Sequence, residues 1–392
     1  MLAAGRLRLV ALGVIGFAGL VDTAFLLGVI SGYAMELGAD SAFAGLIAGL
    51  YSMAAIPASV LAGFIVDRWG RRRSLSLGLA WDSIAMGLYA VVSTPLQLAV
   101  LRVLHALGGS LVYPALFAYI GDVAGPRRGR YSGVTLAAIA GAVAVGNILA
   151  HVLVSEMGFR KPLAIVAFIV LAGFLLSLGL EEPPRQYRPR SRGGGSLDGD
   201  ARLRAALASL IMFLLYLGFG VITGGLTQAQ LEEGLAGSEE EASSYTALAI
   251  ATATMVSIPV FVIAGSGIDR GHARLLAAVS ALAAVATLVE AARVGGSREL
   301  AIAYAPYGVS IGVLMTASTV LAISVPAEYR GRSVAVQQVA NILGVAFGAP
   351  LGGVIASRGL AAHGMAATMP VVLASLVMAA AAGLLGTRAR RG

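Results

Sequence analysis

Twelve long apolar runs, separated by short polar segments, dominate this sequence. A helix crosses the hydrocarbon core of a bilayer with about 20 predominantly apolar residues, and each run approaches or exceeds that length. The runs are rich in Ala, Leu and Gly and lack the ten-residue alternation of an outer-membrane barrel, so we expect an all-α integral membrane protein. The predicted spans are 9–34, 41–66, 74–93, 96–120, 131–156, 162–180, 203–228, 244–266, 274–292, 299–324, 333–356 and 364–386.

Composition excludes the main alternatives. Hydrophobic residues make up 58% of the 392 residues and charged residues only 12%, whereas about a quarter of a soluble domain is charged. The absence of cysteine excludes disulfide scaffolds, thiolate metal sites and a cysteine nucleophile, and we expect neither a metal nor a cofactor. The first run follows Arg6 and Arg8 as a signal peptide would. It is too long for one and carries Asp22 at its middle, so we interpret it as a retained helix.

Arginine placement predicts the orientation. The net charge is +8, and every basic residue except Lys161 is an arginine. The arginines gather in short clusters between apolar runs, a pattern typical of membrane topology and not of nucleic-acid binding. Both termini are therefore expected in the cytoplasm of a multi-pass plasma-membrane protein, with Glu232, Glu233 and Glu239 to Glu241 facing outward. The cytoplasmic clusters are then Arg6 and Arg8, Arg68 to Arg73, Arg127 to Arg130, the 181–204 linker, Arg270 and Arg274, Arg330 and Arg332, and Arg388 to Arg391.

The chain also contains an internal repeat with an offset of 202 residues. The stretch from Gly63 to Arg72 recurs from Gly265 to Arg274, and Arg128-Gly129-Arg130 recurs as Arg330-Gly331-Arg332. Gly146 and Gly348 keep the same offset. Such spacing without net insertion indicates two homologous six-helix halves. We predict bundles over 1–180 and 205–392, related by a pseudo-two-fold axis along the membrane normal, with a Pro- and Gly-rich cytoplasmic linker over 181–204.

Three motifs carry a family resemblance. The pattern G-x-x-x-D-R-x-G-R-R from Gly63 to Arg72 resembles the signature loop of the major facilitator superfamily. The segment from Asp122 to Gly133 resembles that family's loop between helices four and five. The stretch from Arg102 to Ser110 is similar to its fourth-helix R-x-x-Q-G-x-G motif, with His for Gln and Ala for the first Gly. The resemblance implies a transporter of two six-helix bundles that works by alternating access.

The repeated loops are predicted to form a gate. A glycine at 63 permits close approach of a neighbouring helix, and Asp67 is placed to accept hydrogen bonds from a helix N-terminus or an arginine. The resemblance implies that Asp67 meets helix eleven, and that Asp269 meets helix five, in a cytoplasmic latch. The predicted gate residues are Gly63, Asp67, Arg68, Gly70, Arg71, Arg72, Asp122, Arg128, Arg130, Gly265, Asp269, Arg270, Arg274, Arg330 and Arg332.

Ionisable residues inside apolar runs point to the chemistry, because each costs about 2.5 to 3.5 kcal/mol at a helix centre. Asp22 lies in the first run, Asp82 in the third, and Arg102 and His105 one turn apart in the fourth. The resemblance places helices one and four along a central cavity, so we predict that Asp22 and Arg102 form the proton-coupling pair. A static ion pair is the structural alternative. Asp82 lies on a helix that is peripheral in the family and is expected to serve packing or hydrogen bonding.

Polar residues elsewhere predict a mostly neutral substrate wall. They offer donors, acceptors and aromatic faces to a small molecule. The predicted cavity residues are His105, Tyr113, Asn147, Tyr216, Gln228, Tyr307, Gln337, Gln338 and Asn341.

These patterns favour a secondary transporter, with protons as the coupling ion. Drug or metabolite export by proton antiport is the leading interpretation, acting as a monomer in the lipid bilayer on a small-molecule substrate. The fifth-helix motif of such exporters is missing, and Gly344 to Gly353 resembles it in the eleventh helix instead. Proton-coupled import of a sugar or organic anion is the alternative. An intramembrane aspartyl protease built on Asp82 and Asp122 is not favoured, because Asp122 lies in an arginine-rich loop, and no hydrolase or ATPase motif occurs.

Overall fold

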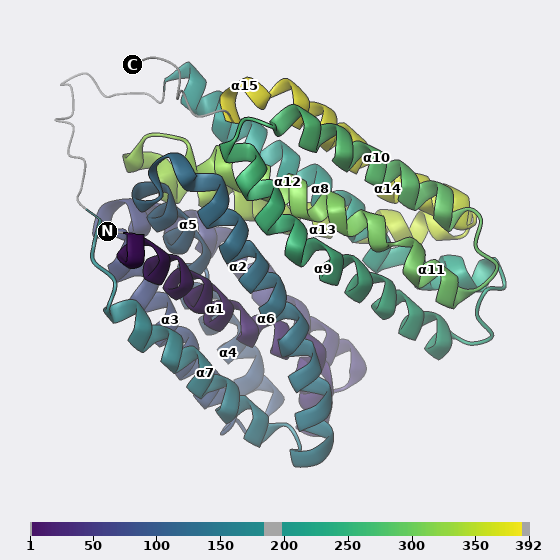
Figure 1. The fold of residues 1–392 in the computed structure, drawn as a ribbon. Coiled ribbons are helices and arrows are strands. Elements are labelled where there is room, and N and C mark those ends of the chain that lie inside the picture. The colour runs from purple at the N-terminus through teal and green to yellow at the C-terminus, as the bar shows by residue number, and fades with distance from the viewer. Residues whose placement is uncertain (1, 184–197, 386–392) are drawn as a thin grey trace. The chain divides into compact units, whose positions relative to one another are not determined.

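A computed structural model describes residues 2–183 and 198–385, and within them the chain is helical and contains no strand (Figure 1). The first half holds α1 (Leu2–Glu36), α2 (Ser41–Trp69), α3 (Arg71–Tyr89), α4 (Pro95–Gly109), α5 (Val112–Val123), α6 (Arg128–Met157) and α7 (Arg160–Leu178). The second half holds α8 (Gly199–Glu232), α9 (Glu239–Asp269), α10 (Ala273–Ala291), α11 (Ser297–Ala303), α12 (Ala305–Ile323), α13 (Arg330–Ala356), α14 (Leu360–Ala380) and α15 (Ala382–Leu385).

Ten candidate membrane spans occur in the described part of the chain, so the predicted count of twelve is not confirmed. Helices do form at all twelve predicted places. The two that fall outside the candidate spans are α3 and α6. In α3 the reason is charge, because Arg71, Arg72, Arg73 and Asp82 share a helix of only 19 residues. The all-α membrane fold itself is confirmed.

The chain divides into two compact units. Unit 1 comprises the described residues of Met1–Val123, Ala138–Pro189 and Pro326–Val336, and unit 2 those of Ala124–Ala137, Arg190–Val325 and Gln337–Gly392. Two short segments thus group across the predicted division at the linker: 124–137 with unit 2 and 326–336 with unit 1. Each of these segments contains the start of a long helix, α6 and α13 respectively.

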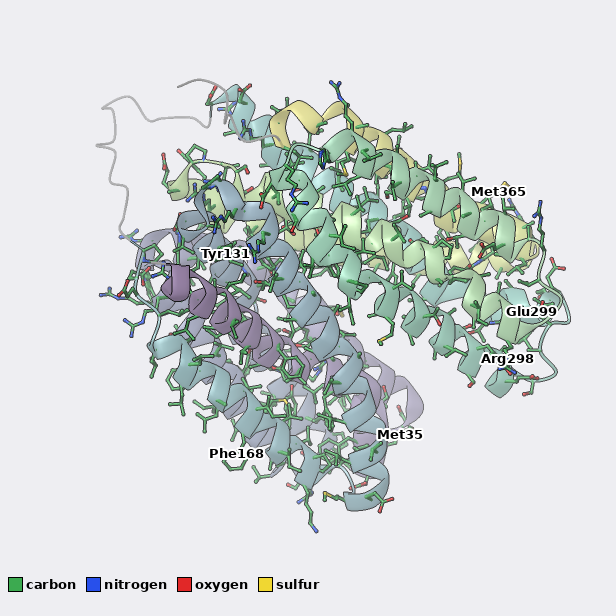
Figure 2. The ribbon with its side chains drawn as sticks, in the orientation of Figure 1. Met35, Tyr131, Phe168, Arg298, Glu299 and Met365 are labelled. Carbon is green, nitrogen blue, oxygen red and sulfur yellow. The ribbon has the colours of Figure 1, made fainter. Side chains whose placement is uncertain are left out.

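Within each unit the helices bury a core and expose apolar side chains outward. In unit 1, α3 packs on α7 and α4, and α2 packs on α4; in unit 2, α12 packs on α9, and α14 packs on α8 and α10. Phe168 on α7 is 70% exposed and Met365 on α14 is 50% exposed (Figure 2). Large apolar side chains on an outer face are unfavourable in water and suit contact with lipid.

Prolines account for two helix breaks that the predicted spans did not include. The run 96–120 forms α4 and α5, which are separated just before Pro114; the run 299–324 forms α11 and α12, separated just before Pro306. A proline has no N–H for the carbonyl four residues earlier, and its ring crowds that carbonyl, which favours a break there. Other helices continue through a proline, at Pro57, Pro259, Pro350 and Pro370.

The glycine motif of α13 serves close packing in unit 2. A Cβ atom at Gly348 would collide with the carbonyl oxygen of Leu217 on α8, and one at Gly352 with the carbonyl oxygen of Val221. Glycine at these positions therefore lets the backbones of α8 and α13 approach directly.

Candidate functional site

Three ionisable side chains from three helices of unit 1 meet in one buried cluster. Asp22 of α1, Asp82 of α3 and His105 of α4 are 0%, 2% and 0% exposed. The Nε2 atom of His105 lies 3.2 Å from Oδ2 of Asp22 and 3.4 Å from Oδ1 of Asp82. One imidazole nitrogen therefore faces two carboxylates. We call these three residues the buried cluster.

Tyrosines enclose the buried cluster. The hydroxyl of Tyr89 lies 3.4 Å from Nδ1 of His105, and the Tyr51 ring meets the histidine ring edge-on at 5.2 Å between centroids. Gly109 on the following turn of α4 makes room for them: a Cβ there would lie 2.8 Å from the Tyr51 hydroxyl and 3.0 Å from Oδ1 of Asp82. Gly109, the residue directly after the motif glycine Gly108, is thus required by the cluster's own packing.

The predicted pairing of Asp22 with Arg102 is not the contact that forms. Asp22 is bonded to His105, whereas the Nη2 atom of Arg102 donates to the carbonyl oxygen of Ala48 at 3.2 Å. The guanidinium carbon of Arg102 lies 5.0 Å from the centroid of the Tyr51 ring, a cation–π contact. Arg102 and His105 share one face of α4, one turn apart. That face meets α2 at the level of Arg102, and α1 and α3 at the level of His105.

Arg102 keeps unused hydrogen-bonding capacity. Its side chain is 4% exposed, yet Nε and Nη1 have no hydrogen-bond partner among the residues that the structure describes. A buried guanidinium with free donors is costly unless it balances negative charge nearby. The carboxylates of Asp22 and Asp82 are the negative charges in this region, since both of them and Arg102 act electrostatically on the same side chain, Tyr51.

The charge balance of the site favours one added positive charge over a divalent metal ion. The donor atoms of the buried cluster lie within 4.8 Å of one another, so by distance alone a cation would fit between them. With both aspartates ionised and Arg102 positive, one additional positive charge makes the site neutral. A proton on His105 supplies that single charge, whereas a divalent ion would leave an excess positive charge in a buried place.

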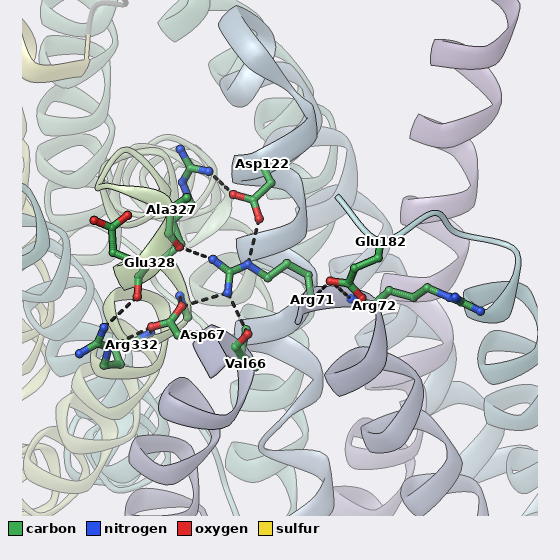
Figure 3. A network of polar contacts seen from close by, with 11 residues as sticks. Val66, Asp67, Arg71, Arg72, Asp122, Glu182, Ala327, Glu328 and Arg332 are labelled. Atoms are coloured by element: carbon green, nitrogen blue, oxygen red, sulfur yellow. Dashed lines mark hydrogen bonds and ion pairs between the residues drawn. The ribbon is translucent and has the colours of Figure 1, made fainter. Parts of the chain in front are cut away.

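A second polar network surrounds Asp67 at the end of α2, also in unit 1 (Figure 3). Its Oδ1 accepts from the backbone N–H of Gly331 at 2.8 Å, and its Oδ2 accepts from the N–H of Arg332 at 3.1 Å and from Nε of that residue at 3.0 Å. Gly331 and Arg332 form the first turn of α13, where unpaired amides and the helix dipole attract a carboxylate. A Cβ at Gly63 would collide with Arg332, so that glycine permits the approach.

Arg71 connects this network to α5. Its Nη1 lies 3.1 Å from Oδ1 of Asp67 and its Nε 2.9 Å from Oδ2 of Asp122, while Nη2 donates to the carbonyl of Ala327. Asp122 also pairs with Arg330. Because the side chains of Arg71 and Asp67 are only 8% and 6% exposed, these are desolvated ion pairs and not surface contacts.

A residue outside the predicted motif completes the network. Glu182, just after α7, accepts from the backbone N–H groups of Arg71, Arg72 and Arg73 at 2.5, 3.4 and 3.3 Å. It thereby caps the N-terminus of α3. Gly70, with φ +115°, leaves the space that this carboxylate occupies.

The second copy of the loop, in unit 2, is simpler. Asp269 accepts from the backbone N–H of Gly129 and of Arg130, each at 2.8 Å, at the first turn of α6. A Cβ at Gly265 would collide with Gly129. The predicted gate residues Arg68, Arg270 and Arg274 are exposed, and Arg128 is half-buried.

The other predicted cavity residues do not all meet in one place. Tyr113 is buried in α5 and lies beside Phe117, with 4.6 Å between their ring centroids. Tyr307 and Gln337 are fully buried, the amide of Gln337 donating to Ser318 at 2.7 Å. Gln228 is exposed and donates to Glu232 at 2.8 Å.

Three of the remaining predicted cavity residues lie in unit 2, on α8 and α13, and two of them, Tyr216 and Asn341, are joined by a side-chain hydrogen bond. Tyr216, Gln338 and Asn341 are half-buried, and the Tyr216 hydroxyl contacts the sulfur of Met315 at 3.7 Å. The side chain of Asn147 lies outside the described part of the structure.

Sequence reasoning missed two participants, Asp82 as a member of the buried cluster and Glu182 as a helix cap. Asp82 did carry a signal, because an acid inside an apolar run is expensive and implies a partner. Glu182 carried none, since an acid in a linker is ordinary in sequence.

Comparison with known proteins places the chain in a family. Residues 12–349 match the family model described as Major Facilitator Superfamily. The chain belongs to the Major Facilitator Superfamily. It is therefore a multi-pass membrane protein of a transporter family.

Individual relatives are more distant. An uncharacterized MFS-type transporter of Methanocaldococcus jannaschii, MJ1560, is 26% identical over 168 residues, which cover 42% of this chain and 44% of the relative. Multidrug resistance protein 1 of Bacillus subtilis is 28% identical over 152 residues, which cover 38% of this chain and 39% of that relative. The matches thus span less than half the length of these relatives.

A solved structure of an MFS transporter, FucP, in the outward conformation, superposes with a TM-score of 0.75 at 15% identity, over 97% of this chain and 99% of FucP. That likeness concerns the fold alone.

Proposed function

We propose that this transporter couples movement of a small solute to protons, exporting drugs or metabolites by antiport through alternating access. The observation that carries the proposal is Asp22, a fully buried carboxylate at the middle of α1 that is hydrogen-bonded to His105. A buried acid with a basic partner is a natural place to bind and release a proton. The partial similarity to a protein named for multidrug resistance supports export.

The test uses proteoliposomes that contain the full-length protein. A compound panel is first screened by counterflow, and accumulation of each hit is then measured with and without a pH gradient. We expect Asp22→Asn to retain counterflow and to lose gradient-driven accumulation, because a neutral amide cannot exchange a proton. Glu290→Gln, the same change at an exposed acid on α10, is the matched control and should accumulate normally. Full accumulation by a well-folded Asp22→Asn carrier would contradict proton coupling at Asp22.

Import of an organic anion by symport is a second candidate, and the unused donors of Arg102 favour it. A guanidinium with two nitrogens, Nε and Nη1, that lack a partner among the described residues suits a carboxylate. The same compound panel tests this alternative. Symport is favoured over export if an anionic compound is taken up together with an inward flow of protons, and if its counterflow is lost in Arg102→Gln.

The networks at Asp67 and Asp269 are proposed to act as the gate of the alternating-access cycle. Asp67 holds the start of α13 against α2, and Asp269 holds the start of α6 against α9. These contacts would form in one conformation and break in the other.

Orientation in the plasma membrane, with both termini cytoplasmic, is proposed from the arginine clusters. The chain has no cysteine, so single introduced cysteines report accessibility without background. An impermeant thiol reagent added to cells should label Gly237→Cys and leave Arg270→Cys unlabelled. The reverse pattern would contradict the orientation.

A further inference from the structure

His105 occupies an unusual position between two acids. Its Nε2 atom is within 3.4 Å of both Asp22 and Asp82, and those carboxylates come from different helices, α1 and α3. A single N–H at Nε2 cannot donate fully to two acceptors at once. In consequence, neither carboxylate has exclusive use of the histidine, and Oδ1 of Asp82 has no hydrogen bond of good geometry among the described residues.

The neighbours of His105 define the charge of this place. Asp22 faces it from α1, Asp82 and Tyr89 from α3, and Tyr51 from α2, while Arg102 lies one turn away on α4. The tyrosines are neutral near pH 7. The two ionised carboxylates carry a charge of −2 and Arg102 carries +1. The net charge of the group is therefore −1 when His105 is neutral.

A buried net charge is strongly unfavourable, so this group of side chains binds one further proton. Replacing either Asp22 or Asp82 by a neutral residue changes the net charge of the group by the same amount. With only one carboxylate left, Arg102 balances it, and the histidine has no electrostatic reason to be protonated. By charge, Asp82 is therefore as necessary as Asp22.

We propose that Asp22, His105 and Asp82 form a single proton site that binds one exchangeable proton only when both carboxylates are present. The proton is held on His105 between the two acids. Its release breaks an N–H bond, leaves neutral imidazole and passes the proton through a carboxylate oxygen of Asp22 or Asp82 to water. This assignment rests on the proposed proton coupling and adds Asp82 and His105 as residues that hold the coupling proton.

A purely structural role for Asp82 makes a different prediction. If Asp82 only orients His105, removing Arg102 as well would add damage. If charge decides, neutralising Arg102 in the Asp82→Asn variant restores the balance that favours a proton, because Asp22 and His105 then remain as an acid and a base alone. If the three residues share one proton site, neutralising Arg102 in the Asp82→Asn variant should therefore restore proton binding.

The experiment counts protons on full-length protein purified in detergent. Difference potentiometric titration between about pH 6 and about pH 10 compares wild type, Asp82→Asn, Asp22→Asn and Asp82→Asn with Arg102→Gln. We expect each single variant to release one proton fewer than wild type, and the double variant to regain it. An unchanged proton count in Asp82→Asn, or no recovery in the double variant, would overturn the proposal. So would stoichiometric divalent metal retained by the purified wild-type protein.

A second measurement covers the case in which an asparagine variant does not fold. His105→Gln keeps a neutral hydrogen-bonding side chain and both acids, so the proton must move to a carboxylate. Infrared spectroscopy should then show a protonated carboxyl band at neutral pH that wild type lacks, and absence of the band would overturn the proposal. A different outcome would separate the two proposals. If the proton counts of all variants are as expected but the wild-type protein shows no gradient-driven accumulation, the proposed function is wrong and the proton site still stands.

Discussion

The two halves of the chain differ most at the buried cluster. At the repeat offset, Asp22, Asp82, Arg102 and His105 correspond to Gly224, Ala284, Tyr304 and Tyr307. The first-half positions carry three side chains that can be charged near pH 7 together with an arginine, and none of their second-half counterparts is charged near pH 7. The loops at Asp67 and Asp269, in contrast, are present in both halves and bind the same kind of helix N-terminus.

This difference separates two tasks. A helix terminus held by a carboxylate is needed wherever two helices must dock and part, and a duplicated fold keeps it twice. Under the proposed function, a proton site is needed once. The second half is therefore free to fill the equivalent volume with tyrosine, glycine and alanine, of which Tyr304 and Tyr307 are 1% and 0% exposed.

The largest effect on stability is expected from Arg102→Ala, and its pH dependence should differ from that of Tyr304→Ala at the corresponding second-half position. Arg102→Ala leaves two buried carboxylates without a fixed countercharge, which costs about 3 to 5 kcal/mol of stability. At low pH a second proton can replace the lost charge, so the destabilisation should grow as pH rises. Thermal unfolding in detergent at about pH 6 and about pH 9 measures this. Tyr304→Ala removes apolar contacts, and its effect should be the same at both values.

The two gate loops are expected to differ in strength. Asp67 accepts from two backbone amides and pairs with Arg71 and Arg332, whereas Asp269 is held by backbone amides. Asp67→Asn should cost the closed gate about 2 kcal/mol, or about a 30-fold shift in the population ratio toward the inward-facing state, and slow transport without preventing insertion. Asp269→Asn should shift it less. Spin-label distances across the loop face measure both populations, and equal shifts would contradict the ranking.

A smaller effect is expected at the linker. Glu182→Gln replaces a carboxylate cap on α3 with an amide and should destabilise by about 1 kcal/mol, seen as a lower unfolding temperature. Glu181→Gln is the matched control, because the Glu181 carboxylate is 86% exposed and lies 3.6 Å from Arg8. The capping role is wrong if the two variants unfold at the same temperature.

The smallest effect is expected at Tyr304. Its hydroxyl is buried and has no hydrogen-bond partner among the described residues, so Tyr304→Phe removes an unsatisfied group. Stability should be unchanged or higher by less than about 1 kcal/mol, and proton-coupled transport should equal wild type. A loss of coupling in Tyr304→Phe would place proton chemistry in the second half as well.

The sequence predicted helices well because long apolar runs and a membrane leave few other options. Predicted runs 96–120 and 299–324 each break in two, and both breaks sit at prolines that were visible in the sequence. The number of membrane spans was harder to predict. The four charged residues of α3 are compatible with a helix packed among other helices, but they make α3 too polar to count as a candidate span.

The site was predicted only in part. Asp22, Asp82, Arg102 and His105 were all recognised as costly residues within apolar runs. Which of them touch could not be derived, because sequence periodicity relates residues on one helix and says nothing of rotation between helices. That rotation decides that His105, and not Arg102, faces Asp22. The contacts of Asp67 and Asp269 were easier to derive, since the repeated Asp and the arginine motifs mark both sides of each contact.

Direct measurement of proton flux tests the central claim most closely. Proteoliposomes with a weakly buffered lumen and an enclosed pH dye are given a substrate identified by counterflow. For wild type we expect substrate movement to be accompanied by an opposite movement of protons. For Asp22→Asn we expect exchange of labelled for unlabelled substrate to continue with no dye signal. Proton movement that persists in a folded, exchanging Asp22→Asn protein would contradict the assignment of coupling to the buried cluster.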